Sequence, residues 1–317
     1  MAKTELIVQN KQGKIYDVSQ LCKEITFEEQ LNDGCSKLQF TLIYDKNLQL
    51  ENGNTLYFKY DGNKVFFGRV FIVNVNSSNE MSVTAYDQLR YLKAKDTIIV
   101  SNDTVSTLVK KGCNYFNLRI TPNLTDTKYR LGKKIDDSMC WLDILYDSID
   151  STLMGCGELY CLRDNFGYIE LVNLKSDILM LNTMLLLTEF DYEKSIDDEV
   201  YNQIKLARDN EETGKRDIFI TKDSNSINND WGLLQLFEVV DKGLTDAQVK
   251  AMADAYLKLY KNESETLSLT AIGDMRVRAG SSFWLELDNI NYKKRVIVQS
   301  ITHEFLPVHT MSIEVKV

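Results

Sequence analysis

The sequence predicts a mainly β protein with α+β content, in which two antiparallel β-barrels flank an α/β insertion. Three observations lead to this prediction. Apolar and polar residues alternate with period two near both ends of the 317-residue chain, as they do on half-buried strands. Helical spacing appears in the middle of the chain. A series of strand and turn signals occurs twice in the same order, which indicates an internal repeat.

The first predicted barrel covers residues 1–95. Residues 38–42 alternate apolar with polar side chains. Apolar runs at residues 55–60 and 65–75 flank an Asp-Gly-Asn turn, which is a hairpin signal. Residues 81–85 alternate again after a polar turn. We expect these segments to form a small antiparallel domain.

The predicted insertion covers residues 96–195, where the pattern changes to helical spacing. Residues 104–111 are expected to form a helix that stops at Gly112, a favoured C-cap residue. A second helix is expected from near residue 137 to about residue 154 and is ended by Gly155. Its predicted apolar face consists of Leu142, Leu145, Ile149 and Leu153.

Two further predictions concern the same insertion. Residues 158–162 and 168–172 are expected to form a hairpin around a turn at 163–167. Residues 178–187 are the most apolar run of the chain, but Asn182 and Thr183 interrupt it. The run is far shorter than the ~20 residues that cross a bilayer. We expect it to be a buried strand or a short helix.

The second predicted barrel covers residues 196–317 and contains an embedded helix at about residues 245–261. Thr245 and Gln248 form a capping-box pattern at the start of this helix. Its expected apolar face is Val249, Met252, Ala253, Tyr256 and Tyr260, and its expected solvent face is Asp246, Lys250, Asp254 and Lys258. Strands are expected at residues 266–272, 283–287, 295–305 and 310–317.

The internal repeat relates the two predicted barrels. The matched segments, in order, are residues 38–45 with 267–274, Gly53 and Asp61 with Gly280 and Asp288, Arg69-Val70 with Arg295-Val296, and Met81-Ser82 with Met311-Ser312. The shared order is strand, glycine, strand, Asp turn, strand with Arg-Val, and a strand that opens with Met-Ser. This order predicts two versions of one β design.

Composition excludes several classes of function. The chain has 37 Lys and Arg against 46 Asp and Glu, which gives a formal net charge of -9. Such a surplus argues against non-specific binding to nucleic acid or to an anionic membrane. The sequence shows no apolar stretch of the kind a secretory signal needs, so we expect neither a signal peptide nor membrane insertion. The chain has only 2 His, so catalysis that depends on histidine is not expected.

No catalytic, cofactor-binding or metal site is predicted. His303-Glu304 begins like the zinc-binding H-E-x-x-H helix, but Pro307 occupies the position of the second histidine and the flanks alternate as strands. His303 and His309 are therefore expected to be structural neighbours in a hairpin.

Asp143, Asp147 and Asp150 share one face of the second predicted helix. Clustered carboxylates are candidates for acid-base chemistry or for binding a divalent cation. These residues lie opposite the apolar stripe, however, so a solvated helix face is the favoured interpretation.

The six cysteines are predicted to be buried free thiols. They are Cys22, Cys35, Cys113, Cys140, Cys156 and Cys161. No two form a C-x-x-C pair, and a chain of this length needs no disulfide framework.

Three segments resemble one known family. They are Ala85-Tyr86-Asp87-Gln88-Leu89-Arg90-Tyr91-Leu92-Lys93 followed by Asp96-Thr97, the turn from Gly273-Asp274 to Arg278-Ala279-Gly280, and the closing segments Ser300-Ile301-Thr302-His303 and His309-Thr310-Met311-Ser312-Ile313. Over essentially its whole length the chain is similar to the XkdQ/YqbQ group of PBSX-like prophage tail proteins, relatives of the baseplate hub of contractile phage tails. Ala279 stands where this group often has proline.

The resemblance implies that both barrels are tail-tube-like and that the chain is not an enzyme and needs no cofactor. It implies a homotrimeric symmetry adaptor that joins the hexameric tail tube to the central spike, since three subunits with two barrels each present six barrels. The implied partners are the tube and spike proteins, with the tape-measure and baseplate wedge proteins as further candidates. The implied location is the tail baseplate of a phage or a phage-tail-like bacteriocin, assembled in the bacterial cytoplasm.

Two alternatives stay open. One is a tail-associated peptidoglycan hydrolase or glycan-binding module, suggested by Asp143, Asp147 and Asp150 together with the 16 Tyr and 3 Trp. The other is a scaffold of a related injection machine. For the particle itself, both a phage and a phage-tail-like bacteriocin stay open.

Overall fold

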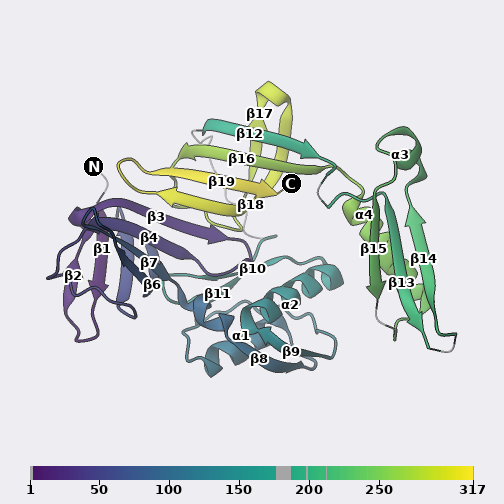
Figure 1. Cartoon of the computed structure of the whole chain (residues 1–317), viewed down its shortest axis with the longest axis horizontal. Helices are drawn as coiled ribbons and strands as arrows, with labels where there is room; N and C mark the ends of the chain where they lie inside the picture. The colour runs from purple at the N-terminus through teal and green to yellow at the C-terminus, as the bar shows by residue number, and fades with distance from the viewer. Residues whose placement is uncertain (1–2, 176–186, 198, 212, 241, 317) are drawn as a thin grey trace. The chain divides into compact units, whose positions relative to one another are not determined.

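The computed structural model describes residues 3–175, 187–197, 199–211, 213–240 and 242–316. The chain divides into two compact units. Unit 1 consists of Met1–Asp191 and Ser268–Val317, and unit 2 of Tyr192–Leu267. Figure 1 shows the elements of each unit. The division into domains at residues 95/96 and 195/196 stays a prediction.

The N-terminal third of the chain forms one half of a large sheet in unit 1. Its strands are β1 (Thr4–Gln9), β2 (Ile15–Asp17), β3 (Cys22–Gln30), β4 (Lys37–Ile43), β5 (Thr55–Tyr60), β6 (Asn63–Val75) and β7 (Glu80–Tyr86). Leu38, Phe40 and Leu42 of β4 are buried, as the alternation predicts. The sequence prediction misses β1 to β3. In β3 the pattern is obscured because Glu24, Glu28 and Glu29 interrupt the apolar residues.

The C-terminal part of the sheet contains β12 (Leu187–Ser195), β16 (Ser264–Ile272), β17 (Ser282–Leu287), β18 (Tyr292–Glu304) and β19 (Thr310–Lys316). The last four overlap the predicted strands. Among the described residues the order is β12-β16-β19-β18-β3-β4-β7-β6-β5-β1-β2, with β17 paired to β18. Thr302 of β18 lies opposite Glu28 of β3, so both ends of the chain share one sheet.

One order of strand pairing occurs twice in this sheet, in agreement with the predicted internal repeat. In the first copy β4 pairs with β7, β7 with β6, and β6 with β5. In the second copy β16 neighbours β19, β19 pairs with β18, and β18 with β17. A β-bulge lies at the equivalent place in each copy, between Val70 and Ile72 and between Val298 and Ser300.

A glycine before the second strand has the same hydrogen bond in both copies. Gly53 donates its N–H to the Val70 carbonyl (2.7 Å), and Gly280 donates to the Val298 carbonyl (2.9 Å). Both glycines have positive φ, 88° and 82°, which other residues rarely adopt. The structure therefore aligns Val70 with Val298 rather than with Val296. The sequence match of Arg69-Val70 with Arg295-Val296 is therefore wrong by two residues. The alternating pattern does not reveal this error, because a shift of two residues keeps each side chain on the same face of the strand.

The fold is mainly β with antiparallel sheets, as predicted. The described pairings of unit 1 run as an open series from β12 to β2. No closed barrel is present among the described residues, so the barrel form of each copy stays a prediction.

Between the two copies lies an α/β segment. Its elements are β8 (Lys95–Val100), α1 (Val105–Tyr115), β9 (Lys134–Cys140), α2 (Trp141–Cys156), β10 (Tyr160–Asp164) and β11 (Ile169–Asn173). α2 begins after Cys140 rather than near residue 137, because residues 134–140 pair with β8. It ends at Gly157, which has φ 72°, and not at Gly155. Leu153 is exposed, so the predicted apolar face is wrong at its last position.

The sequence predicts that the first helix stops at Gly112. This prediction is wrong, because α1 continues to Tyr115. A Cβ on Gly112 would lie 2.9 Å from Cε3 of Trp141, the first residue of α2, and 3.4 Å from Cδ2 of Leu92. The glycine therefore permits close packing of α1 against Trp141 and is not a helix cap.

The predicted hairpin of the insertion is present with a shorter turn. Asn165 and Tyr168 exchange backbone hydrogen bonds around Phe166 and Gly167, which both have positive φ. This is the two-residue, mirror-image turn that suits the twist of a hairpin. The predicted element at residues 178–187 lies outside the described residues except for Leu187, where β12 begins.

Unit 2 is a three-stranded sheet with a helix on one face (Figure 1). β13 (Gln203–Asn210) pairs antiparallel with β14 (Lys215–Lys222) and parallel with β15 (Gln235–Val240). A short helix, α3 (Ser224–Asn229), follows β14. α4 (Asp246–Tyr260) packs on β13 and β14 and begins with the predicted capping box of Thr245 and Gln248. In the described part of the chain, every helix is too short or too polar to span a membrane.

We predict that Gly112→Ala destabilises the protein although alanine is the better helix former. The helix gain is about 1 kcal/mol, whereas overpacking against Trp141 costs about 1–3 kcal/mol. Denaturant unfolding measures the net effect. Gly132→Ala is the control, because a Cβ at Gly132 meets nothing within 4 Å. Equal stabilities of the two variants would contradict the close-packing role.

Candidate functional site

The three segments that carry the family resemblance meet in unit 1 at a largely buried polar cluster, which we call the polar junction. Its members are Glu29, Asp87, Gln88, Asp164, Arg278, His303 and His309. Glu29 lies on β3, Asp87 and Gln88 directly follow β7, and Asp164 ends β10. Arg278 lies in the loop between β16 and β17, His303 lies on β18, and His309 directly precedes β19. A site of this kind brings together parts of the chain that are remote in sequence.

Arg278 is the centre of the polar junction. Its Nε donates to Glu29 Oε2 (3.0 Å) and its Nη2 to Glu29 Oε1, a bidentate pair. The same Nη2 donates to the Asp164 carbonyl oxygen (2.9 Å). The backbone N–H of Arg278 donates to Ser281 Oγ (3.0 Å), which holds the turn in place. One side chain thus joins β3, the β10–β11 hairpin and the C-terminal loop.

Burial and pairing determine the charge of this pair. Burial alone would raise the pKa of the Glu29 carboxyl, but the Arg278 guanidinium holds it below its ordinary value. Burial alone would lower the pKa of Arg278, but Glu29 raises it. Both residues are therefore ionised at neutral pH. Glu29 is 3% exposed and Arg278 20%, so the two charges compensate each other largely away from water.

Asp87 and Asp164 form the second part of the polar junction. Asp87 accepts hydrogen bonds from the N–H groups of Ser36 and Leu89, both at 2.9 Å. Asp164 accepts from Gln88 Nε2 (3.1 Å) and from the Gly167 N–H (2.6 Å). Burial raises the pKa of both carboxyls, and the charge of Asp164 adds to the rise at Asp87. Each carboxyl fixes a turn through backbone donors.

His303 and His309 form the third part and are hairpin neighbours, as predicted. His303 Nε2 lies 3.1 Å from the Val277 carbonyl, and His303 Nδ1 lies 3.0 Å from His309 Nε2. A carbonyl only accepts, so His303 carries its proton on Nε2 and accepts the proton of His309 Nε2 at Nδ1. Burial lowers the pKa of both rings, that of His309 to about 4 with His303 as a further cause. Two neutral rings therefore hold the turn that contains Val277.

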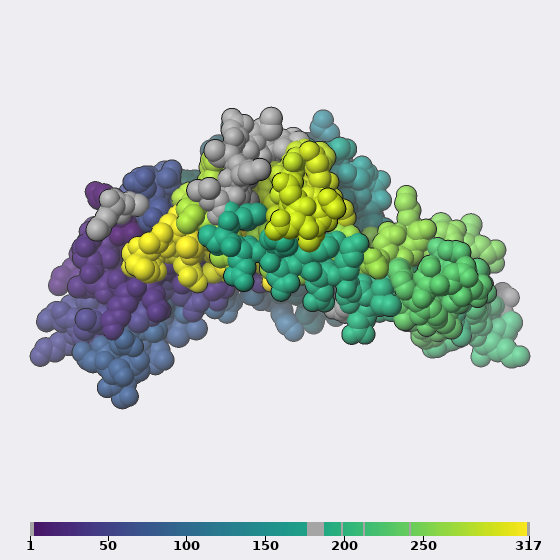
Figure 2. Space-filling model, turned by 90° about the horizontal axis from the view of Figure 1, so that it is seen from above, coloured from purple at the N-terminus to yellow at the C-terminus, as the bar shows by residue number. Residues whose placement is uncertain are grey.

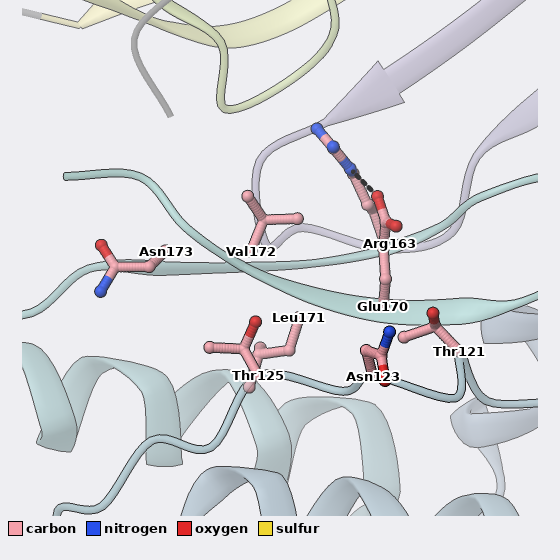
Figure 3. A pocket seen from close by; sticks show the side chains of 8 residues that line it. All are labelled: Thr121, Asn123, Thr125, Arg163, Glu170, Leu171, Val172 and Asn173. Atoms are coloured by element: carbon pink, nitrogen blue, oxygen red, sulfur yellow. Dashed lines mark hydrogen bonds and ion pairs between the residues drawn. The ribbon is translucent and has the colours of Figure 1, made fainter. Parts of the chain in front are cut away.

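Two polar clefts lie beside the polar junction. The first has a volume of about 450 Å³ and is lined by Thr121, Asn123, Thr125, Arg163, Glu170, Leu171, Val172 and Asn173. Figure 3 shows the ion pair of Arg163 and Glu170 in this cleft, which joins Nε to Oε1 at 2.7 Å. The second, about 460 Å³, includes His309 and the ion pair of Asp274 and Arg276. In both clefts an arginine is neutralised by a neighbouring carboxylate.

The other residues considered from the sequence lie apart from the polar junction. Asp143, Asp147 and Asp150 are exposed on α2, which agrees with a solvated helix face. Glu304, next to His303, is also exposed. The described residues contain no group of three or more His, Cys, Asp or Glu side chains placed to hold a metal ion.

The six cysteines are free thiols, as predicted, but not all are buried. Cys113, Cys140 and Cys161 are buried, whereas Cys156 is exposed and Cys22 and Cys35 are half-buried. Cys156 lies at the last position of α2, beyond the buried part of that helix.

The segments that carry the resemblance contain Asp87, Gln88, Arg278 and both histidines, but the sequence predicts no site from them and does not single out Glu29 or Asp164. Glu29 stands in an acidic strand segment whose neighbours, Glu24 and Glu28, are not buried. The only local signal is its position in the alternation, where it falls on the same face as the buried residues Ile25 and Phe27.

A family model described as YQBQ-like matches residues 25–316. No curated protein matches the chain.

Solved structures show the same fold. The 43 kDa tail protein of prophage MuSo2 from Shewanella oneidensis is similar with a TM-score of 0.73 and 13% identity, over 98% of each chain. A tail protein from Neisseria meningitidis MC58 is similar with a TM-score of 0.66 and 13% identity, over 99% of this chain and 96% of that one. The E. coli c3393 protein, a component of the type VI secretion system, is similar with a TM-score of 0.55 and 12% identity, over 98% and 76%.

We predict that Arg278→Met lowers the free energy of unfolding by about 3 kcal/mol, because it leaves the Glu29 carboxylate buried without its cation. Adding Glu29→Met should recover most of the loss, since no unpaired charge then stays buried. Arg276→Met, two residues away and exposed, is the matched control and should unfold nearly as the parent protein does. A double variant no more stable than Arg278→Met would contradict the assigned pairing.

We predict that His309 makes the protein less stable as the pH falls from about 6.5 to 4. In this window unfolded chains bind a proton at His309, but the folded protein, with the pKa of His309 at about 4, does not. Stability from this residue is thus complete above pH 6.5 and lost towards pH 4, by about 3 kcal/mol at most. His309→Gln keeps a donor near Nε2 and should flatten this part of the profile. Urea unfolding at pH 6.5 and at pH 4 measures the free energy of unfolding, and an equal loss of this free energy between the two pH values in His309→Gln and in the parent protein would refute the prediction.

Proposed function

The chain belongs to the YQBQ-like family, whose model matches residues 25–316, and from this premise we propose that it is the structural baseplate hub of a contractile phage tail or a phage-tail-like bacteriocin. A structural role in a phage tail agrees with the similar tail proteins described above. The E. coli c3393 protein is itself described as similar to the T4 tail proteins gp27 and gp5. The more specific role of a hub is our proposal.

The observation that carries the proposal is the repeated strand order in unit 1. β4-β7-β6-β5 and β16-β19-β18-β17 share their pairing, their bulge and the hydrogen bond of the positive-φ glycine. Each chain therefore supplies two similar β modules. Three chains in a ring supply six, and a ring of six equivalent modules matches a hexameric tube while three chains match a trimeric spike.

We assign the parts of the chain accordingly. Residues 1–95 and 196–317 would be the two tube-like parts, and residues 96–195 the insertion between them. The partners would be the tail tube protein and the central spike protein, with the tape-measure and baseplate wedge proteins as further candidates. The polar junction would have a structural role, because its charged and polar groups are used to join segments of the fold.

We predict that the protein forms a trimer, about three times the mass of the 36.5 kDa chain. Mass photometry and multi-angle light scattering measure this for the protein alone and mixed with a tail tube protein and a central spike protein. A monomer that persists at high concentration with both partners present would contradict the hub.

The alternative enzymatic function has its own test. If the chain is structural, a zymogram on purified peptidoglycan should show no clearing. Clearing that Asp147→Ala abolishes would overturn the proposed function in favour of a hydrolase. Lys110→Ala, an exposed change on α1, is the matched control.

A further inference from the structure

One face of the unit 2 sheet is apolar and exposed, although the other is covered by α4. Ile218 and Ile220 of β14 and Phe237 and Val239 of β15 are 46%, 55%, 48% and 44% exposed. The register aligns Ile220, Lys205 and Phe237 in one row and Ile218, Ala207 and Val239 in the next. We call these six residues the outer face. Their alternation partners Leu206 and Phe219 belong to the core that α4 covers.

An exposed apolar surface in two adjacent rows is typical of a docking site. Isolated exposed apolar residues are ordinary, but here four large side chains surround a single buried alanine, Ala207. The strand pairing fixes their backbone, so little order has to be gained on binding.

The outer face is positively charged on an acidic chain. Lys205 lies within it, with Nζ 5.8 Å from the centre of the Phe237 ring. Lys222, directly beside the outer face on the same side of β14, lies diagonally next to Lys205. Arg216, on the same side, is bonded to Asp209 at 2.9 Å, whereas no ion pair joins Lys205 or Lys222 to a described residue. Two outer faces would therefore repel each other, and the complementary surface is acidic.

The chain presents an acidic row of the required form on β12. Glu189, Asp191 and Glu193 are exposed and alternate along one side of this strand, which ends the large sheet in the described part of the chain. Figure 2 shows the teal atoms of this part of the chain at the surface. Successive carboxylates are about 6.8 Å apart along a strand, and diagonal neighbours such as Lys205 and Lys222 are about 7–8 Å apart. The two spacings agree.

We propose that the outer face of one copy of this chain binds the acidic side of β12 in the next copy. The inference rests on the proposed ring and names its contact surfaces. A three-membered ring cannot use a self-complementary patch, because each copy must offer two different surfaces. The lysine–carboxylate pairs set the register of this contact, and the isoleucines and Phe237 supply its apolar area.

Zero-length cross-linking tests the contact directly. Unlabelled and ¹⁵N-labelled full-length chains are mixed before assembly and treated with a carbodiimide, which joins an amine to a carboxylate in direct contact. We expect cross-linked peptides of mixed isotope composition between Lys205 or Lys222 and Glu189, Asp191 or Glu193. Cross-links from these lysines only within one chain, or only to carboxylates outside β12, would overturn the inference.

Charge exchange tests it independently. Lys205→Glu with Lys222→Glu should weaken self-association at least tenfold, and adding Glu189→Lys with Asp191→Lys in the same chain should restore it. Lys250→Glu with Lys258→Glu, on the exposed side of α4, makes the same change of charge and should have no effect. Equal weakening by the control pair, or a failure of the exchange to restore assembly, would refute the contact.

The outcomes separate this inference from the proposed function. If every variant still forms a trimer, the assigned contact is wrong, but the proposed function as a hub is not contradicted. A dimer that the lysine variants dissociate supports the contact and contradicts the threefold ring. A protein that stays monomeric with tube and spike proteins present contradicts both.

Discussion

The bidentate pair of Glu29 and Arg278 is the constraint on which the arrangement of unit 1 depends. The two residues are 249 positions apart, and the pair forms only when the first and last parts of the chain share one sheet. The same guanidinium binds the Asp164 carbonyl, so the insertion is held by the contact as well. A charge such as Glu29 cannot be buried without its partner, and this requirement excludes arrangements that separate the three segments.

Apolar packing alone would specify this arrangement less well. A strand that slips by two residues keeps its apolar side chains on the same face, so alternation leaves such registers nearly equivalent. A buried ion pair adds little to stability relative to apolar residues of similar size. Its effect here is on register, because Thr302 lies opposite Glu28 only in the pairing that also brings Glu29 to Arg278.

What the sequence could and could not predict follows from the range of each interaction. The capping box of α4 and the alternation of β4 depend on neighbours a few residues away, so both are visible in the sequence. The role of Gly112 depends on Trp141, which lies on another helix, and its position favoured the wrong interpretation of a cap. The partner of Arg278 is more remote still. The repeat and the family resemblance both point to Gly280, whereas no local pattern indicates that Glu29 is the partner of Arg278.

The two β modules share features of their backbone conformation but few of their side chains. Gly53 and Gly280 both need positive φ, and both copies contain a bulge after the valine that accepts their hydrogen bond. Most other positions differ in sequence. Shared backbone geometry with divergent side chains agrees with the proposed symmetry adaptor, in which six modules would match in shape while each contacts different neighbours.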